Sequence, residues 1–371
     1  MARTTILPSN PNKRKAWAAS VALDSINEQY FSRLIGAEGT PSVVTKKTET
    51  EKGMGDEVTT ALVAKLRGDP ITEGKKLAGS EFKLSHSAHT MRINEFRHGV
   101  NVGARIEQSR VGFNLKQQGR AKLKDYIKAL YEERIHVHAA GARGVADDFD
   151  TILDLGYTGY PNALRAPDAA HLFVGQAGNK EKNTLVATDL MRLTTINKLR
   201  TKVKKMKGGA PSKAIKISPT VKGGKECYIV AVPAEVMQDI REDVGSQGWF
   251  EAQKALITAI GKDAEAFKGG AGMWNGMLVD ETDLGVYFDD YGATSNVKAA
   301  RSLVLGANAI SIAHGTKGQA DGMTVALDED TDDRGHDNIL FFEMIFGADK
   351  TAYEGMDYGM ITVDTAYTES V

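Results

Sequence analysis

The sequence predicts a mixed α+β protein. Residues 115–140 repeat apolar side chains at three- and four-residue steps, which is typical of one long amphipathic helix. Most other apolar stretches are short and alternate with polar residues, as strands do. The 371 residues include 38 glycines, a larger share than average, which indicates many turns between short elements.

Composition excludes several classes of protein. Lysine and arginine number 47 against 48 aspartates and glutamates, so the overall basic excess of a dedicated nucleic-acid binder is missing. Cys227 stands alone and cannot form a disulfide within the chain. No uninterrupted run of apolar residues is long enough to span a bilayer, and the N-terminal residues lack a signal-peptide pattern. We therefore expect a soluble protein with no membrane partner.

The N-terminal part is expected to be extended. Residues 1–45 mix polar, basic and apolar positions and predict an arm with a short helix over residues 16–34. A charged, glycine-punctuated stretch follows and leads into segments that alternate with period two, which predicts a long hairpin within residues 46–110. Three histidines of this region are expected to be exposed in loops: His86, His89 and His98.

The elements after residue 110 follow from similar patterns. The long helix is about 39 Å in length if it covers 26 residues, and Gly141 is expected to end it. Later helices are predicted over residues 186–206, 233–242 and 249–260. Strands are predicted over residues 214–219, 227–232, 277–279, 286–288, 302–313, 339–348 and 360–366, and an acidic surface loop over residues 328–333.

A basic stretch is the strongest charge asymmetry of the chain. Eleven lysines and arginines and no acidic residue lie between Arg192 and Lys225. The face could meet DNA phosphates, but the stretch has no interleaved aromatic residues on which single-stranded bases would stack. The favoured interpretation is a solvated face or a contact to an acidic surface such as residues 328–333. The candidate residues are Lys198, Arg200, Lys202, Lys204, Lys205 and Lys207.

Motifs for catalysis, cofactors or metals are weak. The glycines of residues 270–276 are spaced too widely for a dinucleotide loop and follow a helix rather than a strand. His136 and His138 are two residues apart on a helix, so they cannot bind one metal ion as an i, i+4 pair would. Residues 328–333 lack the glycine and the final glutamate of a calcium loop. We therefore predict no catalytic residue, no cofactor and no metal.

Four segments carry a resemblance to a known family. They are Gln108-Ser109-Arg110 with the following helix, the turn ending Gly272-Met273-Trp274-Asn275-Gly276, residues 299–307, and residues 347–351 with 357–366. In this order they resemble the major capsid proteins of tailed bacteriophages, in particular the family typified by the coat of coliphage N-four. The resemblance extends from about residue 56 to the C-terminus.

The resemblance implies the tailed-phage capsid fold and its domains. Residues 1–45 would be the N-terminal arm and residues 46–110 the extended loop (E-loop), a β-hairpin. Residues 111–232 would form the peripheral (P) domain with its spine helix. The remaining parts would be an axial (A) domain over residues 233–335 and C-terminal strands that return to the peripheral domain over residues 336–371.

The resemblance also implies a function without catalysis. Many copies would assemble into pentamers and hexamers of an icosahedral head around double-stranded DNA, in the host cytoplasm, and remain in the virion. Expected partners are the chain itself, a portal protein, scaffolding and decoration proteins, and DNA bound without sequence specificity. The hairpin would lie over an adjacent subunit, with candidate contacts at Lys46, Lys47, Glu49, Glu51, Lys52, Arg67, Lys75 and Lys76.

Two alternatives remain open from the sequence. An encapsulin-like compartment would share the fold but enclose protein cargo, and a neighbouring gene for an enzyme with a docking tail would favour it. A soluble α/β enzyme would differ in class, and a stable monomer or dimer that binds a nucleotide would favour that reading.

Overall fold

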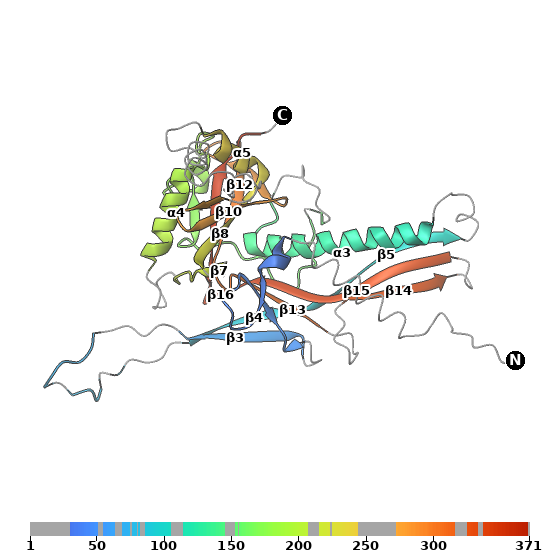
Figure 1. Cartoon of the computed structure of the whole chain (residues 1–371), viewed down its shortest axis with the longest axis horizontal. Helices are drawn as coiled ribbons and strands as arrows, with labels where there is room; N and C mark the ends of the chain where they lie inside the picture. The colour runs from blue at the N-terminus through green and yellow to red at the C-terminus, as the bar shows by residue number, and fades with distance from the viewer. Residues whose placement is uncertain are drawn as a thin grey trace.

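The structure is a computed structural model of the chain. It describes residues 30–50, 55–63, 69–74, 76–79, 81, 86–104, 114–144, 153–154, 156–206, 215–222, 225–243, 272–315, 325–332 and 337–369. Figure 1 shows an elongated half, in which α3 runs along β5 and β15, and a compact half that carries α4 and α5. None of the described helices has the length and apolarity needed to cross a membrane.

A sheet beside α3 forms the elongated half. Its strands follow the order β1 (Ile35–Ala37), β2 (Val44–Lys47), β13 (Ile310–His314), β15 (Asp337–Lys350) and β14 (Val325–Asp332). In addition, β5 (Asn94–Ala104) pairs with the long strand β15. Apolar side chains of α3, such as Leu123 and Ile127, share a core with Leu340 and Phe342 of β15. This packing gives the long helix a rigid support.

The predicted long helix is confirmed as α3 (Leu115–Ala140). The side chain of Asn114 caps its start by accepting a hydrogen bond from the backbone N of Gln117 at 3.1 Å. Gly141 ends the helix with φ +67°. A Cβ at Gly141 would lie 2.0 Å from the carbonyl oxygen of Arg165. Only glycine fits this turn, because both the positive φ and the close backbone exclude a side chain.

A second sheet forms the compact half. Its order is β6 (Leu172–Val174), β18 (Met360–Ala366), β12 (Val297–Leu305), β8 (Lys225–Pro233), β10 (Met277–Thr282) and β9 (Gly272–Trp274), with β11 (Val286–Tyr291) beside β12 and β7 (Thr220–Lys222) beside β8. The helices α4 (Leu193–Lys205) and α5 (Ala234–Glu242) bury their apolar sides on one face of it. Ile229 and Leu303 point from the opposite face into the core shared with α3.

Short elements complete the described part of the chain. They are the 3-10 helices η1 (Phe31–Leu34) and η3 (Lys182–Thr184), the antiparallel pair β3 (Glu57–Val63) and β4 (His86–Arg92), and the pair β16 (Ala352–Tyr353) and β17 (Met356–Asp357).

The predicted hairpin is wrong in extent. Among the described strands of residues 46–110, only β3 and β4 pair with each other as a separate two-stranded sheet. The residues of β2 and β5, which the sequence assigned to the same hairpin, belong to the sheet beside α3, because their main chains pair with β13 and β15. The C-terminal strands also separate, with β15 beside α3 and β18 inside the second sheet.

Other predicted elements need correction. The helix expected over residues 186–206 begins only at Leu193, and the strand expected over 214–219 begins at Thr220. The strand expected over 302–313 is two strands in different sheets, β12 and β13. Residues 328–332 are not a loop but part of β14. The start of the helix over 16–34 and the helix over 249–260 lie outside the described residues.

Candidate assembly surfaces

The β3–β4 hairpin has an inward and an outward face. Val58 and Met91 are buried and form a small cluster with Ala313 of β13. On the outward face the hydroxyls of Thr59 and Thr90 lie 3.1 Å apart, and both side chains are exposed. The hairpin therefore rests on the rest of the chain near its base and presents its outer face to the surroundings.

The residues predicted to contact a neighbouring subunit differ in their exposure. Lys47 is buried in β2 and pairs with Glu38, so it acts within the chain. Lys46 is half-buried on the same strand, and Glu49 and Lys76 are exposed. Four others lie outside the described residues: Glu51, Lys52, Arg67 and Lys75.

The base of the hairpin is fastened through its backbone. The side-chain amide of Asn162 accepts a hydrogen bond from the N of Arg92 at 2.8 Å and donates to the O of Arg92 at 3.0 Å. It also donates to the O of Ala348 on β15 at 3.0 Å. A Cβ at Gly347 would lie 2.2 Å from the O of Arg92. Glycine and asparagine thus let β4 and β15 approach closely at this point.

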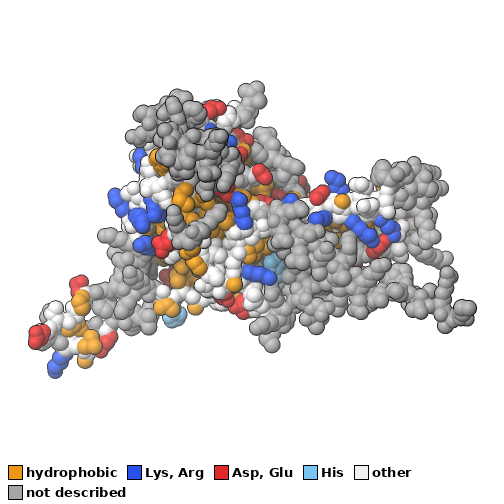
Figure 2. All heavy atoms as spheres, viewed as in Figure 1, with side chains coloured by type: hydrophobic (Ala, Val, Ile, Leu, Met, Phe, Trp, Pro, Cys, Tyr) orange, Lys and Arg blue, Asp and Glu red, His pale blue; other side chains and the backbone are white. Residues whose placement is uncertain are grey.

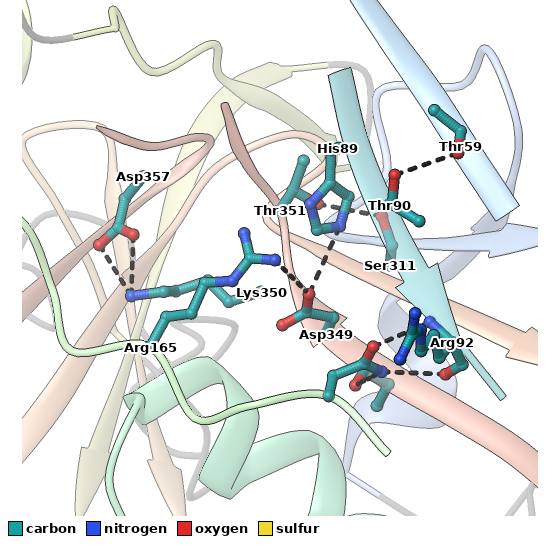
Figure 3. Close-up of polar contacts among 12 residues, drawn as sticks. Thr59, His89, Thr90, Arg92, Arg165, Ser311, Asp349, Lys350, Thr351 and Asp357 are labelled. Atoms are coloured by element: carbon teal, nitrogen blue, oxygen red, sulfur yellow. Dashed lines mark hydrogen bonds and ion pairs between the residues drawn. The ribbon is translucent and has the colours of Figure 1, made fainter. Parts of the chain in front are cut away.

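A buried polar cluster adjoins this base (Figure 3). We define the hairpin-base cluster as His89 of β4, Asp349 of β15 and Arg165 of the segment between α3 and β6. The Nε2 of His89 lies 3.8 Å from Oδ2 of Asp349, and the Nη2 of Arg165 lies 3.3 Å from the same oxygen. His89 is 2% exposed and Asp349 1% exposed, whereas the Arg165 side chain is 39% exposed. The expectation that His89 is exposed in a loop is therefore wrong. His86 and His98 are exposed as expected, but they lie on the strands β4 and β5 rather than in loops.

Burial shifts the pKa values of this cluster toward the neutral forms. It raises the pKa of Asp349 to about 7, although Arg165 acts in the opposite direction. Burial, together with the positive charge of Arg165, lowers the pKa of His89 to about 4. His89 is consequently uncharged at neutral pH, and Asp349 is close to its titration midpoint.

The basic face of α4 is smaller than the sequence predicts. Lys198, Lys204 and Lys205 are exposed, and Figure 2 shows lysine and arginine side chains on the side of the molecule where α4 lies. The Nζ of Lys202 instead donates to the carbonyl oxygen of Leu172 at 2.5 Å.

A second basic side chain of α4 also packs within the chain. The guanidinium of Arg200 lies 4.9 Å from the ring centre of Tyr228. Lys207 lies outside the described residues. The structure therefore brings together three of the six predicted residues as an exposed basic face.

Among the acidic residues of β14, Glu329 forms ion pairs within the chain. Glu329 pairs with Lys116, and with Arg120 at 3.1 Å, both near the start of α3. Asp328 and Asp330 lie on the same strand, with Asp328 half-buried and Asp330 exposed. Part of the expected acidic surface thus ties an edge strand to α3.

Arg301 forms a buried ion pair within the second sheet and also bonds to the end of α3. Arg301 of β12 donates from Nε and Nη2 to the two oxygens of Asp364 on β18, each at 2.7 Å. Its Nη1 donates to the carbonyl oxygen of Ala140, at the end of α3, at 2.8 Å. Tyr291 donates to Oδ2 of Asp364 at 2.7 Å. The second sheet is thereby bonded to the last turn of α3.

Metal and ligand sites do not stand out in the described part of the chain. No group of three or more metal-binding side chains is found among these residues. His136 and His138 are buried on α3, and burial lowers their pKa values to about 4 and about 3.

A hollow of about 430 Å³ lies beside α5. Two of its polar contacts are the ion pair of Arg241 with Glu281 at 2.8 Å and the hydrogen bond that Gln238 donates to Glu242 at 2.8 Å.

No local pattern in the sequence identifies the contacts of Asn162, Arg165 and Asp349. Asn162 is 70 residues from its partner Arg92 and 186 from Ala348, so no local spacing reveals the contact. Only the approach of β4 to β15 brings these side chains together.

Comparison with known proteins identifies the family. The phage capsid protein family matches residues 6–369, nearly the whole chain. The chain belongs to the phage capsid protein family. Among curated protein sequences, none matches it.

Solved structures agree with the family. The capsid protein of Ralstonia phage GP4 is 32% identical, with 100% of both chains covered and a TM-score of 0.79. The capsid protein of cyanophage Pam1 has a TM-score of 0.72 at 16% identity, again over 100% of both chains. That of Helicobacter pylori bacteriophage KHP30 covers 91% of this chain and 92% of its own, with 14% identity and a TM-score of 0.65.

These matches confirm the predicted tailed-phage capsid fold and the role of a major capsid protein. The capsid protein is a structural component of the viral shell that assembles with its own copies, not an enzyme. The encapsulin-like compartment and the soluble enzyme are not favoured.

Proposed function

We propose that this capsid protein forms the pentamers and hexamers of an icosahedral phage head that encloses double-stranded DNA. The family and the 32% identity to the capsid protein of Ralstonia phage GP4 support a shell protein. The observation that carries the proposal is the β3–β4 hairpin, which stands as a separate two-stranded sheet with an exposed outer face. Such a hairpin is marginally stable alone, and a neighbouring copy would stabilise it.

The finer assignments are proposals of the same kind. We place the chain in the subgroup typified by the coat of coliphage N-four, with assembly in the host cytoplasm. We keep the domain boundaries at residues 45, 110, 232 and 335, and within residues 46–110 we limit the hairpin itself to β3 and β4 because β5 pairs with β15. The partners are a portal protein, scaffolding and decoration proteins, and DNA held without sequence specificity. Repeated copies that meet through unlike surfaces close into rings, which suits pentamers and hexamers.

Charged residues in the hairpin and in the segment that leads into it would set the register between adjacent subunits. Glu49 and Lys76 are exposed and available for this contact. Complementary charges across an interface fix orientation more than they add affinity. Lys46 and Lys47 are less suited, because β2 holds them in the sheet beside α3.

Shortening the hairpin tests the proposed contact. Thr60 and His89 are paired across the hairpin, so residues 61–88 can be replaced by an Asn-Gly turn that joins β3 to β4 directly. This change leaves β2, β5 and the hairpin-base cluster in place. We expect a chain that is folded by circular dichroism and sediments as small species, without shells. Normal shells from this variant would refute the hairpin as the contact between subunits.

A contact between subunits is the favoured role of the α4 basic face, defined as Lys198, Lys204 and Lys205. Only these three of the predicted residues are exposed in the described chain. Binding of packaged DNA is the second candidate role, supported by the eleven basic residues of this stretch without an acidic one.

A further inference from the structure

The β3–β4 hairpin is joined to the body of the chain by few contacts. Its two strands pair only with each other in the described chain, and its buried apolar cluster with the body consists of Val58, Met91 and Ala313. Ile93 alone separates β4 from β5, and the long pairing with β15 fixes β5 in the sheet beside α3. The angle of the hairpin therefore depends on what holds the end of β4.

One side chain makes the hydrogen bonds that tie the hairpin strands to the body. Among the described residues, two bonds of good geometry cross this junction, and both join Asn162 to the main chain of Arg92, the last residue of β4. The same amide group also donates to the O of Ala348 on β15 at 3.0 Å. The Arg92 side chain is 65% exposed and pairs with Glu57 inside the hairpin, so the body holds β4 here through its backbone.

The chemistry of this contact requires an asparagine. A side-chain amide has one acceptor oxygen and two donor hydrogens, and Asn162 uses the oxygen and both hydrogens. Asn162 is 7% exposed, and a buried hydrogen bond is stronger than one in water. An aspartate of nearly the same shape would lack both donors, and an alanine would leave the N and O of Arg92 without these partners.

Asn162 belongs to a segment that is fixed independently of the hairpin. Before it, the hydroxyl of Tyr157 accepts a hydrogen bond from Nη2 of Arg134 on α3 at 2.6 Å. After it, the O of His171 accepts from the N of Thr362 on β18 at 2.9 Å. The segment is thus held by α3 on one side and by the second sheet on the other, so Asn162 is a firm point from which to hold β4.

We propose that Asn162 is a latch that sets the angle of the β3–β4 hairpin, and that breaking its bonds to Arg92 frees the hairpin while the body stays folded. The latch concerns how one chain holds its own arm and so goes beyond assembly. Its effect on assembly rests on the proposed function, because a hairpin that is already held in place loses less conformational freedom when it contacts a neighbour.

Hydrogen exchange of the hairpin amides tests the latch. A two-stranded hairpin is marginally stable without support, so its release from the body should open its amides to exchange. The full-length wild type and its variants are measured below the concentration at which shells form. In Asn162→Ala we expect protection of the β3 and β4 amides to fall at least about tenfold, since each lost hydrogen bond weakens an arrangement roughly several-fold and three are lost. Amides of β12 and β18 are the internal reference and should keep their protection, whereas unchanged protection of the hairpin would overturn the proposal.

Three further variants separate the latch from general damage. Asn162→Asp keeps the shape without the donors, so its hairpin protection should fall as in Asn162→Ala. Gly347→Ala should lower hairpin protection with Asn162 intact, because the added Cβ would lie 2.2 Å from the O of Arg92. Asn101→Ala is the matched control at an exposed asparagine of β5, whose side chain accepts from the N of Gly103 on the same strand at 2.8 Å, and it should behave as the wild type. Wild-type protection in Asn162→Asp would overturn the proposal, and this variant and Gly347→Ala decide the matter if Asn162→Ala does not fold.

Shell formation separates the latch from the proposed function. If the hairpin contacts a neighbouring copy, Asn162→Ala should need a concentration of chain several-fold higher than Asn101→Ala to form shells. Lowered protection together with normal shell formation would support the latch and contradict the hairpin as the contact between subunits.

Discussion

Arg301 connects the second sheet to α3 through buried polar contacts. Its guanidinium forms two hydrogen bonds with Asp364 and one with the carbonyl oxygen of Ala140, and all three groups are buried. The bidentate geometry is the strongest arrangement available to this pair. A carboxylate left alone in this position would be costly, because water cannot reach it.

We expect Arg301→Ala to destabilise the chain by about 3–5 kcal/mol, since it leaves Asp364 buried without its cation. Urea unfolding followed by circular dichroism measures the change. Lys298→Ala is the matched control on the same strand, because its ion pair with Glu369 is exposed and is expected to contribute about 0–1 kcal/mol. Equal stabilities of the two variants would contradict this role of Arg301.

Residue-scale prediction from the sequence succeeds where the signal is local. Gly141 was expected to end the long helix, and its positive φ confirms this. Asp349 and Arg165 were not identified, because their partners are far away in the sequence and become neighbours only in the folded chain. His89 was expected to be exposed, but the inward face of the hairpin buries it.

The helices and strands follow the sequence where one face is apolar. The bounds of α3 agree with the predicted 115–140, because a clear apolar stripe, an asparagine cap and a glycine end all coincide. Continuous apolar runs were harder to divide. Residues 302–313 were predicted as one strand although Gly306 and Asn308 are typical turn residues. The chain changes sheets there, and a Cβ at Gly306 would lie 2.4 Å from the carbonyl oxygen of Ser218.

The sequence also failed to predict the acidic strand β14. Its run of aspartates predicted a loop, since such residues are rare in strands. At the edge of a sheet they are tolerated, and Glu329 is neutralised by Lys116 and Arg120 of α3. The partners are more than 200 residues away, so the sequence pattern alone cannot reveal them.

At the scale of the element, the α4 basic face gives a prediction about assembly. Replacing Lys198, Lys204 and Lys205 together by Gln should reduce the yield of shells, because the positive side of a subunit contact is lost, while DNA per completed shell stays unchanged. Sedimentation and the ratio of nucleic acid to protein in purified particles measure both quantities.

Replacing the same three residues by Arg keeps the charge and is the control, for which normal yields are expected. A normal yield of shells from the Gln variant with less DNA in each would instead assign the face to packaged DNA, since each lost phosphate contact lowers the salt-dependent affinity.

The whole molecule has the form that a shell subunit requires. A long helix and the sheet beside it form an elongated half, and the second sheet with α4 and α5 forms a compact half (Figure 1). The hairpin is a separate two-stranded sheet that packs on β13 near its base. The two halves share one apolar core, and Arg301 of the second sheet bonds to the carbonyl oxygen of Ala140 on α3. We therefore expect the halves to move as one unit and the hairpin to be the part whose orientation changes.

Electron microscopy of the fastest-sedimenting material from cells that express the chain tests the central claim most directly. The account predicts closed icosahedral particles in which rings of five and six copies meet, with the β3–β4 hairpin of each copy lying on a neighbour. The chain should be expressed with and without the neighbouring genes, because scaffolding and portal proteins are proposed partners. Small oligomers alone under both conditions would contradict a self-assembling capsid protein.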